Sequence, residues 1–388
     1  SSGVANAGTL DISGTTSGAS IKTVTGAGSV VLGSKTLTLT DASGTYSGAM
    51  SGTSGALVKQ GSGTYTMSGT NSYTGATHID AGTLKLTGSL STLTDVVMSG
   101  VAVWDLQSAQ TVATLTMASG NSITNTAGTS SLSVNGASTL ANSITTSGTQ
   151  TYTGAVTLAD DLSVNTTNSA VTFSSGVTGS GKALTVSAGS GDIAMSTIGV
   201  SGTPVGAVTL NSTGVTTLGG AVYASSVTTN AGGSLAINTG TISTSGNQTY
   251  NDAVSLGADL SMSTSSNGSV VFASTVNGAK SLTVSTNGTG DVTMSGAVGG
   301  TTALTDLTIT TDVLSAPAIT LATNGGLSVT NGGASAITGI ISGSGVTLTK
   351  AGAGTLTLSG ANTYTGATNV DAGTLKLTGS LSTLTDVV

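Results

Sequence analysis

The chain of 388 residues contains no cysteine and only two prolines, one tryptophan and two phenylalanines. It also lacks arginine and glutamate, since its charged residues are all aspartate or lysine. Without cysteine, neither a disulfide framework nor a thiolate metal site can form. Glutamate and arginine favour helices, whereas the glycine, threonine and valine that are abundant here disfavour them. The composition therefore predicts an all-β protein without helices longer than an isolated turn.

Charge is scarce and mostly negative. Fifteen acidic and eight basic residues give a net charge of −7 and a pI of about 4.2. The lysines are scattered, whereas nucleic-acid binding needs a clustered basic patch, so we expect no nucleic-acid partner. No apolar run approaches the roughly 18–20 residues of a membrane helix, and we predict no transmembrane segment in this sequence. The hydrophobic share of 37% and the mean hydropathy of +0.32 favour a folded chain over a disordered one.

Apolar and polar residues alternate strictly in many short runs. Examples are TLTLT at 36–40, TLKLT at 83–87 and TLTLS at 355–359. A period of two places Leu, Val and Ile on one face of a strand and Thr, Ser or Lys on the other. Clusters of Gly, Asn and Ser separate the runs and supply turns. The pattern predicts strands of about four or five residues that follow one another every 7 to 15 positions.

One passage occurs twice in the chain. Residues 71–97 and 362–388 differ only at Ser72/Thr363, His78/Asn369 and Ile79/Val370. Upstream of them, residues 57–69 (LVKQGSGTYTMSG) resemble residues 348–360 (LTKAGAGTLTLSG). Self-similarity at a fixed offset is the signature of repeat architectures.

A second similarity, with an offset of about 98 residues, lies between these copies. Gln150-Thr151-Tyr152 is echoed by Gln248-Thr249-Tyr250, and KALTV at 182–186 by KSLTV at 280–284. We therefore predict three segments. Residues 1–97 form a solenoid segment that ends in the first copy, residues 98–341 hold two 98-residue repeats at about 144–241 and 242–340, and residues 342–388 form the second copy.

Two architectures fit these repeats. One is a single parallel β-solenoid, in which coils of roughly 20 residues stack at about 4.8 Å per coil. The other is a series of β-sandwich domains of about 100 residues. A sandwich core usually needs large aromatic side chains, which are few here, whereas Val, Leu, Ile and Ala can fill a narrow solenoid. We favour the solenoid and keep tandem sandwiches as the alternative.

The repeated passage resembles a known repeat family. GAGTLTLSG at 352–360, NTYTGAT at 362–368 and DAGTLKL at 371–377 are similar to the autotransporter-associated β-strand repeat. The similarity covers about residues 61–86 and 352–377, while the 98-residue units more loosely resemble filamentous-haemagglutinin-like surface proteins. The resemblance implies a right-handed parallel β-helix, export and display at the surface of a Gram-negative bacterium, and a passenger that often mediates adhesion. It implies no shared catalytic residues.

Candidates for chemistry are few. His78 is the only histidine, and its counterpart is Asn369, so we expect an exposed loop residue. Asp160 and Asp161 are the only adjacent acidic pair; we expect a solvated turn, although paired carboxylates can hydrolyse glycosides. The turns at 189–192 (GSGD) and 288–291 (GTGD) faintly resemble calcium-binding repeats. Asp80 and Asp371 precede AGTLKL and are candidates to cap backbone amides. We predict no catalytic, cofactor-binding or metal-binding residue, with Ca²⁺ as the one alternative.

Two further patterns bear on surface recognition. Six tyrosines lie beside threonine and near glycine, and we expect them to stack as a structural ladder rather than to grip glycans: Tyr46, Tyr65, Tyr73, Tyr152, Tyr250 and Tyr364. Thr-x-Thr strands could order water and bind ice, but this requires the motif in coil after coil, and Lys85, Lys376 and Tyr65 interrupt it.

These observations lead to one functional hypothesis and its alternatives. We expect a non-enzymatic, extracellular structural or adhesive solenoid, part of a larger bacterial surface or secreted protein, that self-associates into filaments or matrix. Partners would be further copies of the chain, or a host or environmental surface or glycan. The alternative is a glycan-binding or carbohydrate-active β-helix protein.

Overall fold

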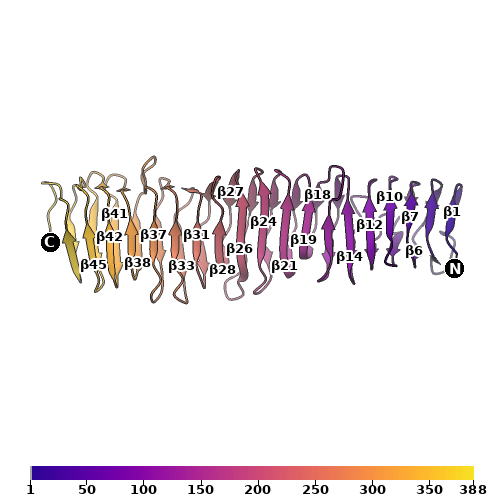
Figure 1. The fold of residues 1–388 in the computed structure, drawn as a ribbon, viewed down its shortest axis with the longest axis horizontal. Coiled ribbons are helices and arrows are strands. Elements are labelled where there is room, and N and C mark those ends of the chain that lie inside the picture. Colours follow the sequence, from indigo (N-terminus) through magenta and orange to yellow (C-terminus); the bar gives the residue numbers. More distant parts are fainter. Residues whose placement is uncertain (1) are drawn as a thin grey trace. The chain divides into compact units, whose positions relative to one another are not determined.

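The computed structural model describes residues 2–388 and divides into two compact units, residues 1–191 and 192–388. We call them the N-terminal and the C-terminal unit. Both consist of short strands joined by turns, and no helix occurs in residues 2–388. In each unit the strands of successive coils lie side by side (Figure 1).

The N-terminal unit contains β1 to β24. Their bounds are β1 Val4–Asn6, β2 Thr9–Asp11, β3 Ala19–Ile21, β4 Val24–Gly26, β5 Ser29–Val31, β6 Thr36–Leu39, β7 Gly44–Tyr46, β8 Met50–Ser51, β9 Ala56–Lys59, β10 Thr64–Met67, β11 Thr77–Ile79, β12 Gly82–Leu86, β13 Val96–Met98, β14 Ala102–Leu106, β15 Gln110–Val112, β16 Leu115–Met117, β17 Ser122–Thr124, β18 Leu132–Val134, β19 Ser138–Thr146, β20 Gln150–Tyr152, β21 Val156–Thr166, β22 Val171–Phe173, β23 Val177–Thr178 and β24 Leu184–Gly189.

The C-terminal unit contains β25 to β47. Their bounds are β25 Ile193–Met195, β26 Val205–Ser212, β27 Val215–Leu218, β28 Val222–Thr229, β29 Ser234–Ile237, β30 Thr241–Thr244, β31 Gln248–Tyr250, β32 Ala253–Leu256, β33 Leu260–Thr264, β34 Val270–Phe272, β35 Val276–Asn277, β36 Leu282–Ser285, β37 Val292–Met294, β38 Leu307–Thr311, β39 Leu314–Ala316, β40 Ile319–Thr320, β41 Gly326–Asn331, β42 Ala334–Ile337, β43 Ile341–Ser342, β44 Thr347–Ala351, β45 Thr355–Leu358, β46 Thr368–Val370 and β47 Thr374–Leu377.

Strand pairing within each unit is parallel and advances by one coil at a time. In the N-terminal unit Leu57 pairs with Thr77, and in the C-terminal unit Ser261 pairs with Thr283. Each coil therefore takes about 20 residues, as the sequence predicts. A β-sandwich is built from antiparallel strands, so the prediction of a parallel β-solenoid is confirmed for each unit, and the sandwich alternative is wrong.

The strands of each unit form three columns. In the C-terminal unit one column runs β28–β30–β33–β36–β38–β41–β44–β46, a second β28–β31–β34–β37–β39–β42–β45–β47, and a third β25–β27–β29–β32–β35. The long strand β28 belongs to two of them, because its first half pairs with β30 and its second half with β31. Side chains that stand in register in successive coils therefore form ladders along each column.

The core is a stack of inward side chains, one set per coil. In the C-terminal unit Ile242, Met262, Val284, Ile309 and Val329 stand in register, and all are fully buried. Their neighbours on either side along each strand point outward, as the period of two requires. Burial of apolar surface contributes about 25 cal/mol per Å², so these ladders are the main source of stability.

All but one of the few aromatic side chains lie inside this core. Trp104, Phe173 and Phe272 are at most 1% exposed. Tyr152 stacks on Phe173 of the next coil with ring centroids 4.8 Å apart, and Tyr250 stacks on Phe272 at 5.3 Å. The scarcity of aromatics thus reflects a narrow core that admits one ring per coil in places.

Glycine allows coils to approach closely at one corner of the N-terminal unit. Gly48, Gly69 and Gly88 follow one another there, and a Cβ on Gly69 would lie 2.0 Å from the carbonyl oxygen of Gly48. A larger residue would push the coils apart, which explains the glycine at this point of each coil.

The strands differ in length from the prediction, ranging from two residues in β8 to eleven in β21. The long strands β19, β21 and β28 continue round a corner of the coil, and the register between β19 and β21 shifts at that corner, where Asn142 has a positive φ of 59°. No helix in residues 2–388 has the length and apolar character needed to cross a bilayer.

Candidate functional site

The similar stretches just upstream of the repeated passage, residues 57–69 and 348–360, each contain a buried lysine. Lys59 Nζ donates hydrogen bonds to the carbonyl oxygens of Gly61 (2.8 Å) and Ala81 (2.7 Å), and Lys350 Nζ to those of Gly352 (2.8 Å) and Ala372 (3.1 Å). Both side chains are fully buried. Burial lowers the pKa of Lys59 to about 8, partly offset by Asp41, and also lowers the pKa of Lys350. Each lysine ties the carbonyls of its own turn to those of the next coil.

A buried asparagine in each copy forms hydrogen bonds that join three successive coils. Asn71 Oδ1 accepts from the Met50 amide at 3.1 Å, and Asn71 Nδ2 donates to the Ser89 carbonyl at 3.0 Å. In the second copy Asn362 makes the same bonds to Ile341 (2.9 Å) and Ser380 (3.0 Å). The side chain thus connects the preceding coil, its own coil and the following one.

The tyrosine that follows each asparagine is also tied internally. The hydroxyls of Tyr73 and Thr77 lie 2.6 Å apart, as do those of Tyr364 and Thr368. Burial raises the pKa of Tyr73 and Tyr364, and both rings are fully buried. The recurrent lysine, asparagine and tyrosine in and just before the repeated passage are therefore buried residues whose side chains form polar hydrogen bonds, and those of the lysine and the asparagine join neighbouring coils. We call such residues polar clamps.

The 98-residue repeat carries its own buried clamp. Tyr152 donates to Gln150 Oε1 at 2.7 Å, and Tyr250 donates to Gln248 Oε1 at 2.9 Å. The side-chain nitrogen Nε2 of Gln150 and that of Gln248 each donate a 2.9 Å hydrogen bond to a backbone carbonyl of the following coil. The two kinds of repeat use different residues for one purpose, which is to satisfy buried polar groups across coils.

His78 lies on strand β11 and not on a loop, so that prediction is wrong. It stands half-buried on the outward face, in register with Val58 and Val97. The strict alternation of β11 explains this position, because Thr77 and Ile79 on either side are fully buried. No histidine, cysteine or acidic residues in residues 2–388 gather in threes as potential metal ligands.

Asp160 and Asp161 lie within β21 rather than in a turn, which corrects the second prediction. Asp160 forms an ion pair with Lys182 at 3.1 Å and accepts from the Ser119 hydroxyl at 2.8 Å. The Ser119 and Lys182 bonds lower the pKa of Asp160 to about 2. Asp161 Oδ1 instead accepts from the Ala183 amide at 2.8 Å. The two carboxylates thus bind different neighbours.

Several other acidic residues join adjacent coils in the same way. Asp192 Oδ1 accepts from the Val215 amide at 2.8 Å, and Asp291 Oδ1 from the Val313 amide at 3.2 Å. These are the aspartates of the two turns that resemble calcium-binding repeats. Ca²⁺ binding there stays the alternative that the sequence offers. Asp80 does not cap an amide as expected; it accepts from Ser99 Oγ at 2.9 Å and Gln60 Nε2 at 3.3 Å. The short aspartate side chain reaches the next coil, which accounts for its use here.

All six tyrosines singled out from the sequence are fully buried, which excludes them as exposed glycan contacts. The expected ladder is present in part, since Tyr152 and Tyr250 each stack on a phenylalanine of the next coil. The seventh tyrosine, Tyr223, is different, because it lies on β28 between inward Val222 and Ala224 and is half-exposed. The alternation of that strand could have revealed its outward position.

Tyr223 begins a ladder of outward residues in the C-terminal unit. It pairs with Ser243, and the ladder continues through Ser263, Ser285, Thr310 and Thr330. A second ladder, two residues earlier on each strand, consists of Thr241, Ser261, Thr283, Thr308 and Ser328. We call these two ladders the hydroxyl face. It presents two hydroxyl groups on each of five consecutive coils.

Most of these hydroxyl groups have no hydrogen-bond partner within residues 2–388. Ser263 donates to Ser243 at 3.0 Å. Among the hydrogen bonds of residues 2–388, none involves the side-chain hydroxyl of the other nine residues of the face. Neighbouring coils are about 4.8 Å apart, and residues i and i+2 of a strand about 6.6 Å. The C-terminal unit therefore offers a regular, uncharged array of hydrogen-bonding groups.

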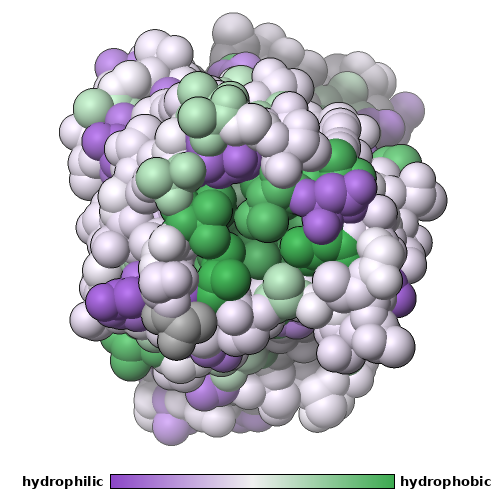
Figure 2. Space-filling view, turned by 90° about the vertical axis from the view of Figure 1, so that its right-hand side faces the viewer, coloured by the Kyte–Doolittle hydropathy of each residue, from purple (hydrophilic) through white to green (hydrophobic). Residues whose placement is uncertain are grey.

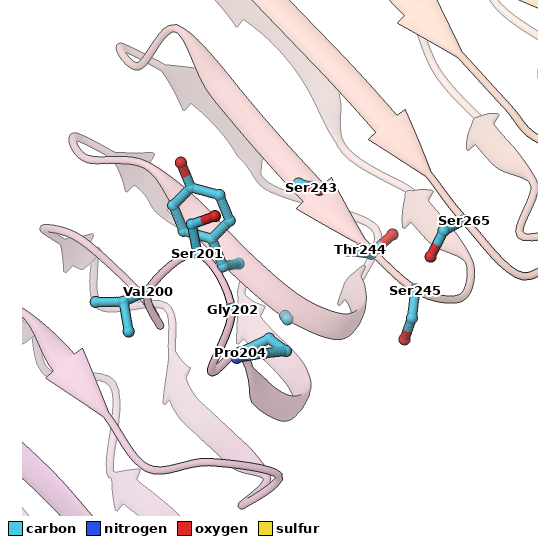
Figure 3. Close-up of a pocket in the computed structure, with 10 residues that line it drawn as sticks. Val200, Ser201, Gly202, Pro204, Ser243, Thr244, Ser245 and Ser265 are labelled. Carbon is cyan, nitrogen blue, oxygen red and sulfur yellow. The ribbon is translucent and has the colours of Figure 1, made fainter.

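A half-open pocket of about 200 Å³ lies beside the first coils of the hydroxyl face. One side is the loop that carries Val200, Ser201, Gly202 and Pro204, and the other side is formed by the strands and turns around Ser243, Ser245 and Ser265 (Figure 3). Tyr223, Ala224 and Thr244 complete the lining. The loop is held by hydrogen bonds from Thr203 to Val200 and from Tyr223 to Ile198. None of the lining residues is charged.

The two copies of the repeated passage differ in the solvent exposure of the apolar side chains in their last coil. In the first copy Leu86 and Val96 are fully buried, whereas their equivalents Leu377 and Val387 are 44% and 60% exposed. Apolar side chains also lie open at the end of the N-terminal unit where the chain begins, ringed by polar residues (Figure 2). Val4 and Leu10 of the first coil are partly exposed there. At both places, apolar side chains of the solenoid core are exposed at the end of a stack of coils.

Comparison with known proteins supports the resemblance noted from the sequence. The passenger-associated-transport-repeat model matches residues 57–86 and 348–377, which include Lys59, Tyr73, Lys350 and Tyr364. Neither a curated protein nor a solved structure matches the chain. Two copies of a passenger repeat on parallel solenoids make the chain similar to an autotransporter passenger. The chain therefore contains two passenger-associated transport repeats.

Proposed function

We propose that the chain is a non-enzymatic, extracellular passenger solenoid of a bacterial surface or secreted protein, with a structural or adhesive role. The observation that carries this proposal is the pair of passenger repeats, whose lysine and asparagine residues bind each coil to the next. A protein that folds coil by coil after export benefits from such clamps, because each new coil is fixed as it docks. The exposed surface would then meet other cells, surfaces or matrix.

Display at a cell surface tests the proposal. The full chain is fused to an autotransporter translocator domain in a Gram-negative host, and added protease and flow cytometry report exposure. The account expects a displayed chain that resists proteolysis as intact units. A matched chain with Lys59→Met and Lys350→Met should be displayed at lower level or be degraded. Retention of the unaltered chain inside the cell contradicts the passenger role.

We also propose that copies of the chain associate through the ends of the stacks. The exposed Leu377 and Val387 and the open apolar surface in Figure 2 support this, since exposed apolar patches commonly mark interaction sites. The edge strands at such ends also leave backbone groups available for pairing. Sedimentation velocity over a wide concentration range tests it, and a chain that stays monomeric throughout contradicts it.

A further inference from the structure

The pocket and the hydroxyl face form one continuous surface of the C-terminal unit. Tyr223 lines the pocket and is also the first member of the ladder that continues through Ser243, Ser263 and Ser285. A ligand seated against Tyr223 would therefore meet hydroxyl groups in the next coils without leaving the surface. This arrangement distinguishes the C-terminal unit, because β9 and β11, the N-terminal counterparts of β44 and β46 in this column, belong to an outward ladder of Val58, His78 and Val97.

The chemistry of the surface specifies the ligand class. The ten pocket residues and the eleven residues of the hydroxyl face include no charge. The nearest acidic side chains along the strands, Asp259 and Asp306, already accept from the amides of Ser281 (2.9 Å) and Gly326 (2.9 Å). A charged ligand would find no counter-ion among the residues of the pocket and the face, since the nearest cation, Lys280, lies just before β36, and it would lose hydration. An uncharged ligand rich in hydroxyl groups would replace water with equivalent hydrogen bonds.

The pocket adds a preference for a ring with an apolar face. Ligand sites combine aromatic surface with a few polar groups that fix orientation, and a tyrosine supplies both an apolar ring and a polar tip. A pyranose ring has C–H groups on its faces and hydroxyl groups at its edge, so it can pack on Tyr223 and bond to the serines around it. The pocket is smaller than the roughly 300–1,000 Å³ of sites for drug-sized ligands, which suits one sugar ring.

We infer that this surface binds an uncharged polysaccharide, with one sugar ring in the Tyr223 pocket and the following sugars along the hydroxyl face. Repeating hydroxyl groups at a spacing of about 4.8 Å from coil to coil match a repetitive ligand better than a compact one. The inference rests on the proposed adhesive role and names its ligand class. Its test measures binding in solution, so it can fail while display at the cell surface succeeds, and the reverse.

The test is affinity electrophoresis of the purified full chain in native gels that contain one polysaccharide each. The probes are dextran, laminarin, mannan and hydroxyethyl cellulose, with dextran sulfate and alginate as charged comparisons. We expect retardation by at least one neutral probe, and its dissociation constant is read from mobility against probe concentration. Tyr223→Ala should raise that constant at least tenfold, and Tyr223→Phe should restore most of the binding because it keeps the ring.

A second pair of variants tests the hydroxyl face. Ser285→Lys with Thr310→Lys should raise the dissociation constant at least fivefold, since two long cations would stand in the path of the polysaccharide. The matched control is Thr249→Lys with Thr293→Lys, which places the same charges on a neighbouring outward ladder of the same unit. The control should bind as the unaltered chain does. Circular dichroism confirms that all variants fold.

Three outcomes would overturn the inference. One is no retardation by any of the four neutral probes. Another is retardation that both Tyr223→Ala and the Ser285/Thr310 variant leave unchanged, which would place binding elsewhere. The third is that the chain arrests ice growth while none of the probes binds, which would mean that the hydroxyl face orders water instead of sugar.

Discussion

The side-chain amine of Lys59 donates a 2.7 Å hydrogen bond to the carbonyl oxygen of Ala81, which lies in the next coil. Lys350 and Ala372 repeat this relationship at 3.1 Å in the second copy of the passage. A charged donor buried among carbonyl groups forms stronger hydrogen bonds than a neutral one. The passenger repeat is thus held by polar bonds that run from coil to coil as well as by its apolar core.

Lys59→Met should weaken the repeat. The substitution keeps an unbranched apolar side chain but leaves the buried carbonyls of Gly61 and Ala81 without their donor, at a cost of about 1–3 kcal/mol. Hydrogen exchange of the amides between residues 57 and 86 measures the local opening free energy. Lys85→Met is the matched control, because Lys85 points outward on β12, and it should change the opening free energy by about 0.5 kcal/mol or less. Equal effects of the two substitutions would contradict the clamp.

Tyrosines inside and outside the core should respond differently to truncation. Tyr250→Ala removes a fully buried ring that stacks on Phe272, and we expect a loss of about 3–5 kcal/mol. Tyr223→Ala removes an outward ring and should cost about 0.5 kcal/mol. Urea denaturation of the two variants, followed by circular dichroism, measures both. Similar losses would mean that Tyr223 supports the fold, and it would then be unsuitable as a binding residue.

Asp252 should make the C-terminal unit sensitive to pH. Its side chain is 2% exposed, Oδ1 accepts from the Gly233 amide at 2.8 Å, and Oδ2 has no partner in the part of the chain that the structure describes. Burial raises the pKa of Asp252 above its usual value of 3.8. A carboxyl group whose folded pKa is raised stabilises the fold at low pH and loses this contribution as the pH rises through the folded pKa.

Asp252→Asn therefore should stabilise the protein at pH 7 by about 1–3 kcal/mol, because it removes a buried charge. At pH 3 both forms are neutral at this position, and the difference should largely disappear. Thermal unfolding of the two proteins at both pH values measures the effect. A gain of equal size at pH 3 and pH 7 would show that the charge of Asp252 is not its cause.

Charges at the open end of the C-terminal unit should suppress self-association. Leu377→Lys with Val387→Lys adds two cations to a surface whose counterparts, Leu86 and Val96, are buried in the first copy. We expect the sedimentation coefficient of the variant to stay constant with concentration while that of the unaltered chain rises. Leu93→Lys is the control, because Leu93 is 66% exposed on a loop away from the ends. Association that persists in the double variant would contradict end-to-end contact.

The parallel solenoid could be predicted because its signals are local. Alternating runs such as residues 36–40 and 83–87 define an inward and an outward face, and the repeats define the period. The same alternation puts Lys59 inward beside Leu57 and puts Tyr223 outward beside Val222, so both could have been found. Residue type alone does not place them, because lysine is expected outside, and the neighbours of a tyrosine in sequence do not give its phase along the strand.

The surface of the C-terminal unit could not be predicted from local patterns. Coils take different lengths, so Ser285 and Thr310 are 25 residues apart while Thr310 and Thr330 are 20 apart, and no fixed period aligns them. Adjacent acidic residues favour solvent, so the sequence predicts a turn at Asp160 and Asp161, yet β21 continues through them. Register between coils is set by packing of the core, which one sequence does not reveal.

Distances between coils test the central claim most directly, which is that the residues of the hydroxyl face advance by one coil at each step. The chain has no cysteine, so pairs of spin labels can be placed at Thr241 with Thr308 and at Thr241 with Thr349, three and five coils apart, and measured by double electron–electron resonance. At about 4.8 Å per coil, the second distance should exceed the first by about 10 Å, each with a narrow distribution. Equal distances, or a second distance shorter than the first, would contradict a parallel stack.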